Sequence, residues 1–175
     1  MKKIVAFVGA VVLSAGVALA GEMPAGWAPP KISPELERVK ALAGKWTGTS
    51  LEKTGDKPVT VTYQVTAGGS AVVETIDPGM RNEMITVYHD KSGKLSMTHY
   101  CMLGNQPELD LKSSTDGKLE LDMSPESHAA LANQMHMHSL TLETASDSLT
   151  QTWTAWSPDG KAMEPSVFKL HRFTS

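Results

Sequence analysis

Cysteine is almost absent from this sequence, because its 175 residues include only Cys101. A single cysteine cannot form a disulfide within the chain, so side-chain packing must hold the fold together even in an oxidising compartment. An excess of positive charge is also lacking, since 16 Lys and Arg stand against 19 Asp and Glu. The formal net charge of -3 makes nucleic acids and anionic membranes unsuitable partners.

Long hydrophobic runs are missing after the first twenty residues, and the one run present has the features of a secretory signal. Lys2 and Lys3 form a basic start, residues 4–17 are largely apolar, and residues 18–20 (Ala-Leu-Ala) match a cleavage site. The run is a marginal membrane span and no second run follows. Gly21, not cysteine, comes next, which argues against a lipid anchor. We expect cleavage after residue 20, export to the periplasm or the medium, and no membrane association afterwards.

The remaining chain is predicted to hold a tether and one domain. Residues 21–32 are rich in Pro and Gly and show no hydrophobic period, which is typical of a tether. Ser33-Pro34-Glu35 then provides an N-cap, a proline at the first helical position and an acidic first turn. A short helix with one apolar stripe should follow and end at Gly44. Residues 33–175 therefore form the predicted domain.

From residue 45 onward, apolar and polar residues alternate with period two, and turn residues recur about every eight to twelve positions. This pattern is typical of an all-β sandwich or barrel. The tight hairpins favour an antiparallel up-and-down barrel, interrupted only by a short helix within residues 124–134. Ten strands are predicted, at residues 45–51, 58–66, 71–76, 82–89, 94–102, 108–114, 118–123, 136–144, 148–156 and 163–172.

Several motifs resemble known barrels. The stretch Leu-Ala-Gly-Lys-Trp-Thr-Gly at 42–48 resembles the start of lipocalin-like, or calycin, barrels, where a short helix precedes a Trp on the first strand. GSAVVET, EMITVYH and THYCMLGNQP resemble a family of bacterial exported proteins of unknown function assigned to such barrels. The resemblance implies that Trp46 packs under Arg172 and closes the lower end of the barrel. With ten antiparallel strands, both residues lie at that end.

Two strands carry histidines that the strand period predicts to point inward. On the strand at 94–102, His99 and Cys101 share a face with Leu95 and Met97, and this apolar face should line the lumen. On the strand at 136–144, Leu140 and Leu142 mark the inner face. The same phase places His136 and His138 inside and leaves Met137 outside. The residues predicted to meet at the upper rim of the lumen are His99, Cys101, His136 and His138, with Glu83 and Gln106 in the adjoining loops.

Metal or haem binding is one chemistry that this rim suggests. Two imidazoles at His136 and His138 on one strand face suit a single ion, and the N and S donors favour Zn, Cu or Ni. Strands three apart in such a barrel are separated by about 10 Å, so the two-histidine pair is preferred to a site of four ligands. Alternatively, one of the histidines would be the axial ligand of haem against a Met-rich lumen.

Two further interpretations stay open. Cys101 would be a nucleophile with a nearby histidine as base, although no oxyanion-hole signature accompanies it. Alternatively, Cys101 is a small buried hydrophobe, the histidines are hydrogen-bonded rim residues, and the barrel is packed solid. The preferred hypothesis is an exported binding protein that holds a small, largely apolar ligand in its lumen. A transition metal and haem are the candidate cofactors.

Overall fold

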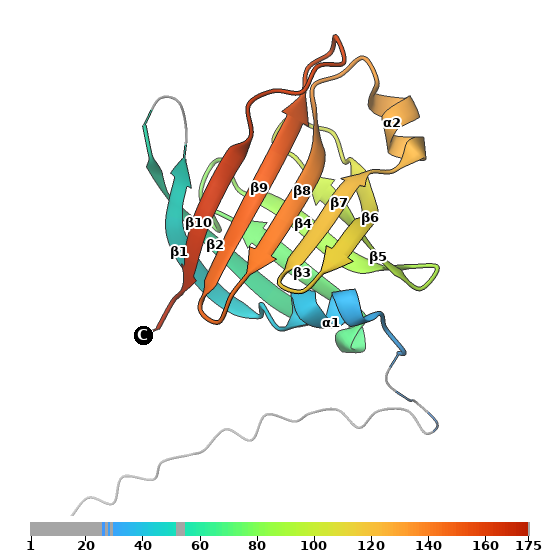
Figure 1. Cartoon of the computed structure of the whole chain (residues 1–175), viewed down its shortest axis with the longest axis vertical. Coiled ribbons are helices and arrows are strands. Elements are labelled where there is room, and N and C mark those ends of the chain that lie inside the picture. Colours follow the sequence, from blue (N-terminus) through green and yellow to red (C-terminus); the bar gives the residue numbers. More distant parts are fainter. Residues whose placement is uncertain (1–25, 27, 29, 52–54, 175) are drawn as a thin grey trace, which may run out of the picture.

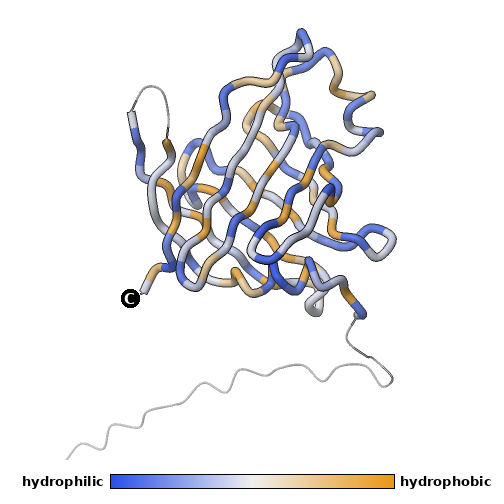
Figure 2. Tube along the Cα trace, in the orientation of Figure 1, coloured by the Kyte–Doolittle hydropathy of each residue, from blue (hydrophilic) through white to orange (hydrophobic). Residues whose placement is uncertain are grey.

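Alternating hydrophobic and hydrophilic residues build ten strands that close into one antiparallel barrel (Figures 1 and 2). Each strand pairs with its neighbours in the chain, and the first strand pairs with the last. The predicted all-β barrel with two short helices is confirmed. The elements are α1 (Pro34–Lys40), β1 (Gly44–Leu51), β2 (Lys57–Thr66), η1 (Ala67–Gly69), β3 (Ala71–Ile76), β4 (Met84–Lys91), β5 (Lys94–Tyr100), β6 (Glu108–Thr115), β7 (Lys118–Met123), α2 (Pro125–Leu131), β8 (His136–Thr144), β9 (Ser148–Trp156) and β10 (Ser166–Arg172).

This computed structural model describes residues 26, 28, 30–51 and 55–174. The predicted signal at 1–20 and residues 21–25, 27 and 29 of the predicted tether lie outside the described residues. Within the described part, no helix is long and apolar enough to cross a membrane. β10 begins three residues later than predicted, at Ser166, because Pro165 has no N–H group for a strand ladder.

The lower end of the barrel is closed where the first and last strands meet. Trp46 of β1 lies opposite Arg172 of β10, and the guanidinium carbon lies 4.4 Å from the centre of the indole ring. Arg172 also donates hydrogen bonds of 3.0 and 2.8 Å to the carbonyl oxygens of Ala41 and Ala43. These contacts join both strands to the segment that follows α1.

α1 covers this lower end (Figure 1). Its buried residues Leu36 and Val39 belong to the hydrophobic core of the barrel. The Ser33 hydroxyl accepts a hydrogen bond of 3.1 Å from the Leu36 N–H, as predicted for an N-cap. It also donates to the Asp90 carboxylate at 2.7 Å. The helix start is thereby attached to β4.

A β-bulge in β8 overturns the predicted orientation of two histidines. The register between β8 and β9 shifts between Met137 and Ser139, so one extra residue is inserted and the alternation of side chains reverses. Leu140 keeps its predicted inward position, but Met137 also lines the lumen. His136 and His138 consequently lie outside the barrel, and the prediction that both point inward is wrong.

Candidate functional site

The upper part of the lumen is hollow and forms a cavity of about 680 Å³. Its wall is mostly apolar and comes from every strand except β6 and β7. Lys57, Asp77 and Asn82 lie at the mouth, where the upper loops and strand ends meet. The cavity can therefore take an apolar molecule. The side chains that matter most for its chemistry are Val59, Ile76, Met84, His99, Trp153 and Phe168.

Two buried polar side chains line the cavity, Ser50 and His99, and His99 is the one that can titrate. It projects from β5, is 1% exposed, and its ring centre lies 4.7 Å from that of Trp153. Its Nδ1 atom lies 2.9 Å from the Thr86 hydroxyl, whereas its Nε2 atom is buried without a hydrogen-bond partner. Burial lowers the pKa of His99 to about 4. The imidazole is therefore neutral near pH 7, with one unsatisfied nitrogen.

Below the cavity, the lumen is filled by a buried polar network around the Glu74 carboxylate. Tyr88 donates a hydrogen bond of 2.6 Å to it, and Tyr63 donates one of 3.2 Å. Gln151 donates to it at 2.6 Å and, through its amide oxygen, accepts a hydrogen bond of 3.1 Å from the Trp153 indole. Burial raises the pKa of Glu74, and these donors oppose that effect. Burial also raises the pKa of both tyrosines.

Thr86 links His99 to this network. Thr86 is paired with Glu74 of β3 on one side and with His99 of β5 on the other. Its hydroxyl can donate to or accept from Nδ1 of His99, so Nε2 correspondingly carries a hydrogen or a lone pair. His99 thus places one unpaired imidazole nitrogen in the wall of the cavity.

The other residues predicted for the upper rim do not gather around this lone pair. Cys101 is largely buried in the turn after β5 and does not line the cavity. Glu83 is exposed and accepts a hydrogen bond of 2.5 Å from the Gly79 N–H. Gln106 is exposed and donates to the Gly104 carbonyl at 3.2 Å. Only His99 of the predicted set reaches the cavity.

His136 and His138 instead form a cluster outside the barrel, near α2. Their Nε2 and Nδ1 atoms lie 3.2 Å apart. The His138 ring stacks on Trp156 with a centroid distance of 3.8 Å, and His128 of α2 meets it edge-on at 5.6 Å. The pKa of His138 is lowered, chiefly by burial and also by the neighbouring histidines, although Asp122 opposes the shift.

Neither a preformed metal centre nor an activated thiol is visible in the described part of the chain. No three His, Cys, Asp or Glu side chains there stand in position to hold one ion together. Burial raises the pKa of the Cys101 thiol, which is the reverse of what a cysteine nucleophile requires.

Sequence reasoning missed the network around Glu74, although the strand period contained the signal. Glu74 alternates with the inward Val72 and Ile76 on β3, and Gln151 alternates with Leu149 and Trp153 on β9. The period alone therefore places both polar groups in the lumen. A buried carboxylate requires partners on neighbouring strands.

No protein-family model matches this chain, and no curated protein matches it. Among solved structures, the fold is similar to that of Rv2717c from M. tuberculosis, with 13% sequence identity and a TM-score of 0.57 over 82% of this chain and 100% of that chain. A protein of unknown function from the DUF3598 family of Nostoc punctiforme has 13% identity and a TM-score of 0.44, covering 77% of this chain and 48% of its own. At such identities the likeness concerns the fold, and this chain is a closed ten-strand β-barrel capable of binding a ligand.

Proposed function

We propose that this protein is an exported, calycin-like binding protein that holds a small, largely apolar molecule in its lumen. The observation that carries the proposal is the unpaired, buried Nε2 of His99, a side chain that lines a mostly apolar cavity. A buried polar atom without a partner costs about 1–3 kcal/mol. That cost is offset when a ligand supplies the missing hydrogen bond. The site therefore favours a ligand over an empty lumen.

The hydrogen-bond roles define the class of ligand. We infer that the Thr86 hydroxyl, which is paired with Glu74 across the sheet, accepts from Nδ1 of His99, so that Nε2 accepts rather than donates. A matching ligand has an apolar body and one donor group, such as a hydroxyl or an N–H. The aromatic ring of Trp153 and the side chain of Phe168 lie along the cavity wall, where an aromatic or branched body would pack.

A matched pair of probes tests this specificity. 1-Naphthol has an apolar body with one hydroxyl donor, and 1-methoxynaphthalene has a similar body without a donor. Titration followed by quenching of tryptophan fluorescence should give 1-naphthol an affinity about tenfold higher, corresponding to one hydrogen bond of roughly 1.4 kcal/mol. In His99→Leu, the preference for 1-naphthol should disappear.

Two methionine variants separate binding in the lumen from binding at the surface. Met84→Trp fills the cavity and should abolish binding of both probes. Met163→Trp places the same ring at a position that is 40% exposed and outside the cavity, so binding should be retained. Equal affinities for the two probes in the unmodified protein would contradict the assigned role of His99.

A second candidate ligand is haem, which Nε2 of His99 would hold through its iron. The unpaired nitrogen and the ring fixed by Thr86 fit this role. Met84, Met137 and Phe168 would supply an apolar wall for the macrocycle. When bound, haem would supply iron-centred chemistry, while the chain would bind it and exclude water from it.

Haem binding has its own spectroscopic test. Addition of haemin to the purified protein should shift and sharpen the Soret band with a stoichiometry of one. His99→Leu should abolish that change, whereas His138→Leu, outside the barrel, should not. An unchanged spectrum on addition of haemin to the unmodified protein would exclude haem and leave the apolar ligand as the remaining proposal.

A further inference from the structure

A pair of histidines is arranged for chemistry outside the lumen. The bulge in β8 places His136 and His138 on the same outer side, with Nε2 of the first 3.2 Å from Nδ1 of the second. Two nitrogens bound to one tetrahedral Zn²⁺ at about 2.0–2.1 Å are separated by roughly 3.3 Å. The two facing nitrogens are therefore already at the spacing of a chelating pair.

The far nitrogens of both rings face oxygen acceptors. Nδ1 of His136 lies 2.7 Å from the Gln134 carbonyl oxygen, which can only accept, so this nitrogen carries the hydrogen and Nε2 is a bare lone pair. Nε2 of His138 lies 3.7 Å from a carboxylate oxygen of Asp122. A carbonyl or carboxylate behind each ring is the usual outer shell of a histidine that binds a metal.

Both rings can present lone pairs without becoming charged. In the absence of an ion, Nδ1 of His138 donates the hydrogen in the contact with His136. When an ion binds, that proton leaves Nδ1 and another is taken up at Nε2, which faces Asp122. His138 stays neutral and both facing nitrogens become ligands. Lys112, 2.9 Å from the same carboxylate, limits the charge that Asp122 contributes.

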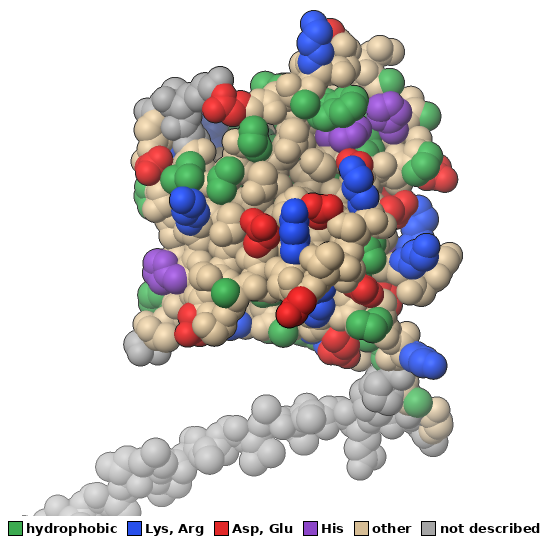
Figure 3. All heavy atoms as spheres, viewed as in Figure 1, with side chains coloured by type: hydrophobic (Ala, Val, Ile, Leu, Met, Phe, Trp, Pro, Cys, Tyr) green, Lys and Arg blue, Asp and Glu red, His purple; other side chains and the backbone are tan. Residues whose placement is uncertain are grey.

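The surroundings fix the rings and bring a third imidazole close. Trp156 stacks on His138 with an angle of 9° between the ring planes. His128 of α2 lies edge-on to both rings, at 5.6 Å from His138 and 6.1 Å from Trp156. Figure 3 shows histidine side chains gathered near α2 on this face. Because the side chain of His128 is exposed, it has room to turn towards the pair.

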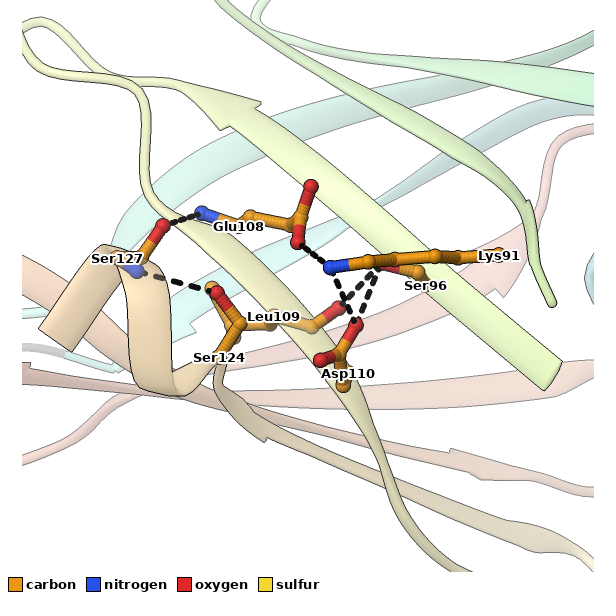
Figure 4. Close-up of polar contacts among 7 residues, drawn as sticks. All are labelled: Lys91, Ser96, Glu108, Leu109, Asp110, Ser124 and Ser127. Atoms are coloured by element: carbon orange, nitrogen blue, oxygen red, sulfur yellow. Dashed lines mark hydrogen bonds and ion pairs between the residues drawn. The ribbon is translucent and has the colours of Figure 1, made fainter.

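The position of α2 is set by hydrogen bonds to the start of β6 (Figure 4). The Ser127 hydroxyl accepts a hydrogen bond of 2.9 Å from the Glu108 N–H, and the Ser124 N–H donates one of 2.9 Å to the Glu108 carbonyl. The Ser124 side chain caps the helix by accepting from the Ser127 N–H at 3.2 Å. These contacts hold the first turn of α2, so His128 is presented near β8 by a fixed backbone.

We propose that His136 and His138 bind a divalent transition-metal ion outside the barrel, with His128 as the third ligand after its side chain turns. Imidazole donors select Zn²⁺, Cu²⁺ or Ni²⁺ over Mg²⁺ and Ca²⁺. This site is separate from the lumen, since neither His136 nor His138 lines the cavity. Metal binding here does not depend on the ligand proposed for His99.

Calorimetric titration of the protein, purified without a polyhistidine tag, with Zn²⁺ tests the site. One equivalent should bind, Mg²⁺ should not compete, and Co²⁺ should give visible d–d absorption. His138→Gln keeps a polar side chain over Trp156 and should weaken Zn²⁺ binding more than about tenfold. His171→Gln, exposed on β10, and His99→Gln, inside the lumen, should bind as the unmodified protein does.

Two further variants assign the remaining roles. His128→Gln should weaken binding about tenfold if this side chain is the third ligand, and Asp122→Asn should weaken it about tenfold as an outer-shell acceptor. Circular dichroism of each variant checks that the barrel is intact, and His138→Gln carries the test if His136→Gln fails to fold. Absence of Zn²⁺ binding, or binding unchanged in folded His138→Gln, would overturn the proposal.

Discussion

The Thr86 hydroxyl lies 2.9 Å from Nδ1 of His99, and Thr86 is paired with Glu74 on the neighbouring strand. The imidazole in the cavity wall and the buried carboxylate below it are therefore separated by one threonine. Substitutions in the Glu74 network should alter ligand binding at His99 if the hydroxyl transmits its hydrogen-bond direction from one group to the other.

Tyr88→Phe should destabilise the fold by about 1.5–3 kcal/mol, because it removes a hydrogen bond of 2.6 Å to a buried carboxylate. Tyr100→Phe is the matched control, since Tyr100 is 50% exposed and should change stability by less than about 0.5 kcal/mol. Urea unfolding followed by circular dichroism measures both. Equal effects of the two substitutions would show that the hydrogen bond from Tyr88 to the Glu74 carboxylate does not stabilise the fold.

His99 should make stability depend on pH. The pKa of His99 is about 4 in the folded protein and about 6.5 in an unfolded chain, so between these values the unfolded chain binds a proton that the folded chain does not. The free energy of unfolding should therefore fall by roughly 3 kcal/mol as the pH falls from about 7 to 4, and the effect should level off below that.

His99→Gln isolates this contribution, because the other titrating groups are common to both proteins. Its free energy of unfolding should decline less steeply than that of the unmodified protein over the same pH range. Urea titrations at several pH values give the two curves. Parallel curves would show that His99 takes up its proton at the same pH in the folded barrel as in the unfolded chain.

Cys101 should react slowly with a thiol reagent such as DTNB in the folded protein. The thiol is largely buried and its pKa is raised by burial, so little thiolate is available near pH 8. Unfolding in urea should increase the rate strongly. A fast reaction in the folded state that slows in His99→Gln would instead revive the hypothesis of a cysteine nucleophile.

Gly48→Ala should destabilise the barrel by about 1–3 kcal/mol. A Cβ atom at this position would lie 1.9 Å from the Lys169 carbonyl oxygen, so β1 and β10 would have to separate. Thr47→Ala, the preceding residue on β1, is the control and should cost less than about 1 kcal/mol. The unfolding midpoint in urea distinguishes the two.

The barrel was predictable because strand after strand repeats the same alternation of inward and outward side chains. Inward Val59, Val61 and Tyr63 on β2 follow the same period as Leu149, Gln151 and Trp153 on β9, and many such strands with short turns leave few alternatives to a barrel. The inward position of His99 followed from the same rule. The alternation extends over a whole strand, so one irregular residue hardly changes the prediction that the strand exists.

The position of His136 and His138 was not predictable in the same way. One extra residue in the bulge at Met137–Ser139 reverses the alternation, and neither Met nor His marks a bulge as a glycine often does. Extrapolating the phase backwards from Leu140 therefore gave the wrong face. The histidine cluster also needs α2, whose placement depends on contacts with β6 that are remote in the sequence.

The pairing of Trp46 with Arg172 also has a consequence for folding kinetics. β1 can complete its ladder only when β10 is available, so the contact that closes the barrel joins the two ends of the domain. Such a large sequence separation implies slow folding. During synthesis, the edge of β1 stays unpaired until β10 is available, and an unpaired strand edge can pair with another chain and start aggregation.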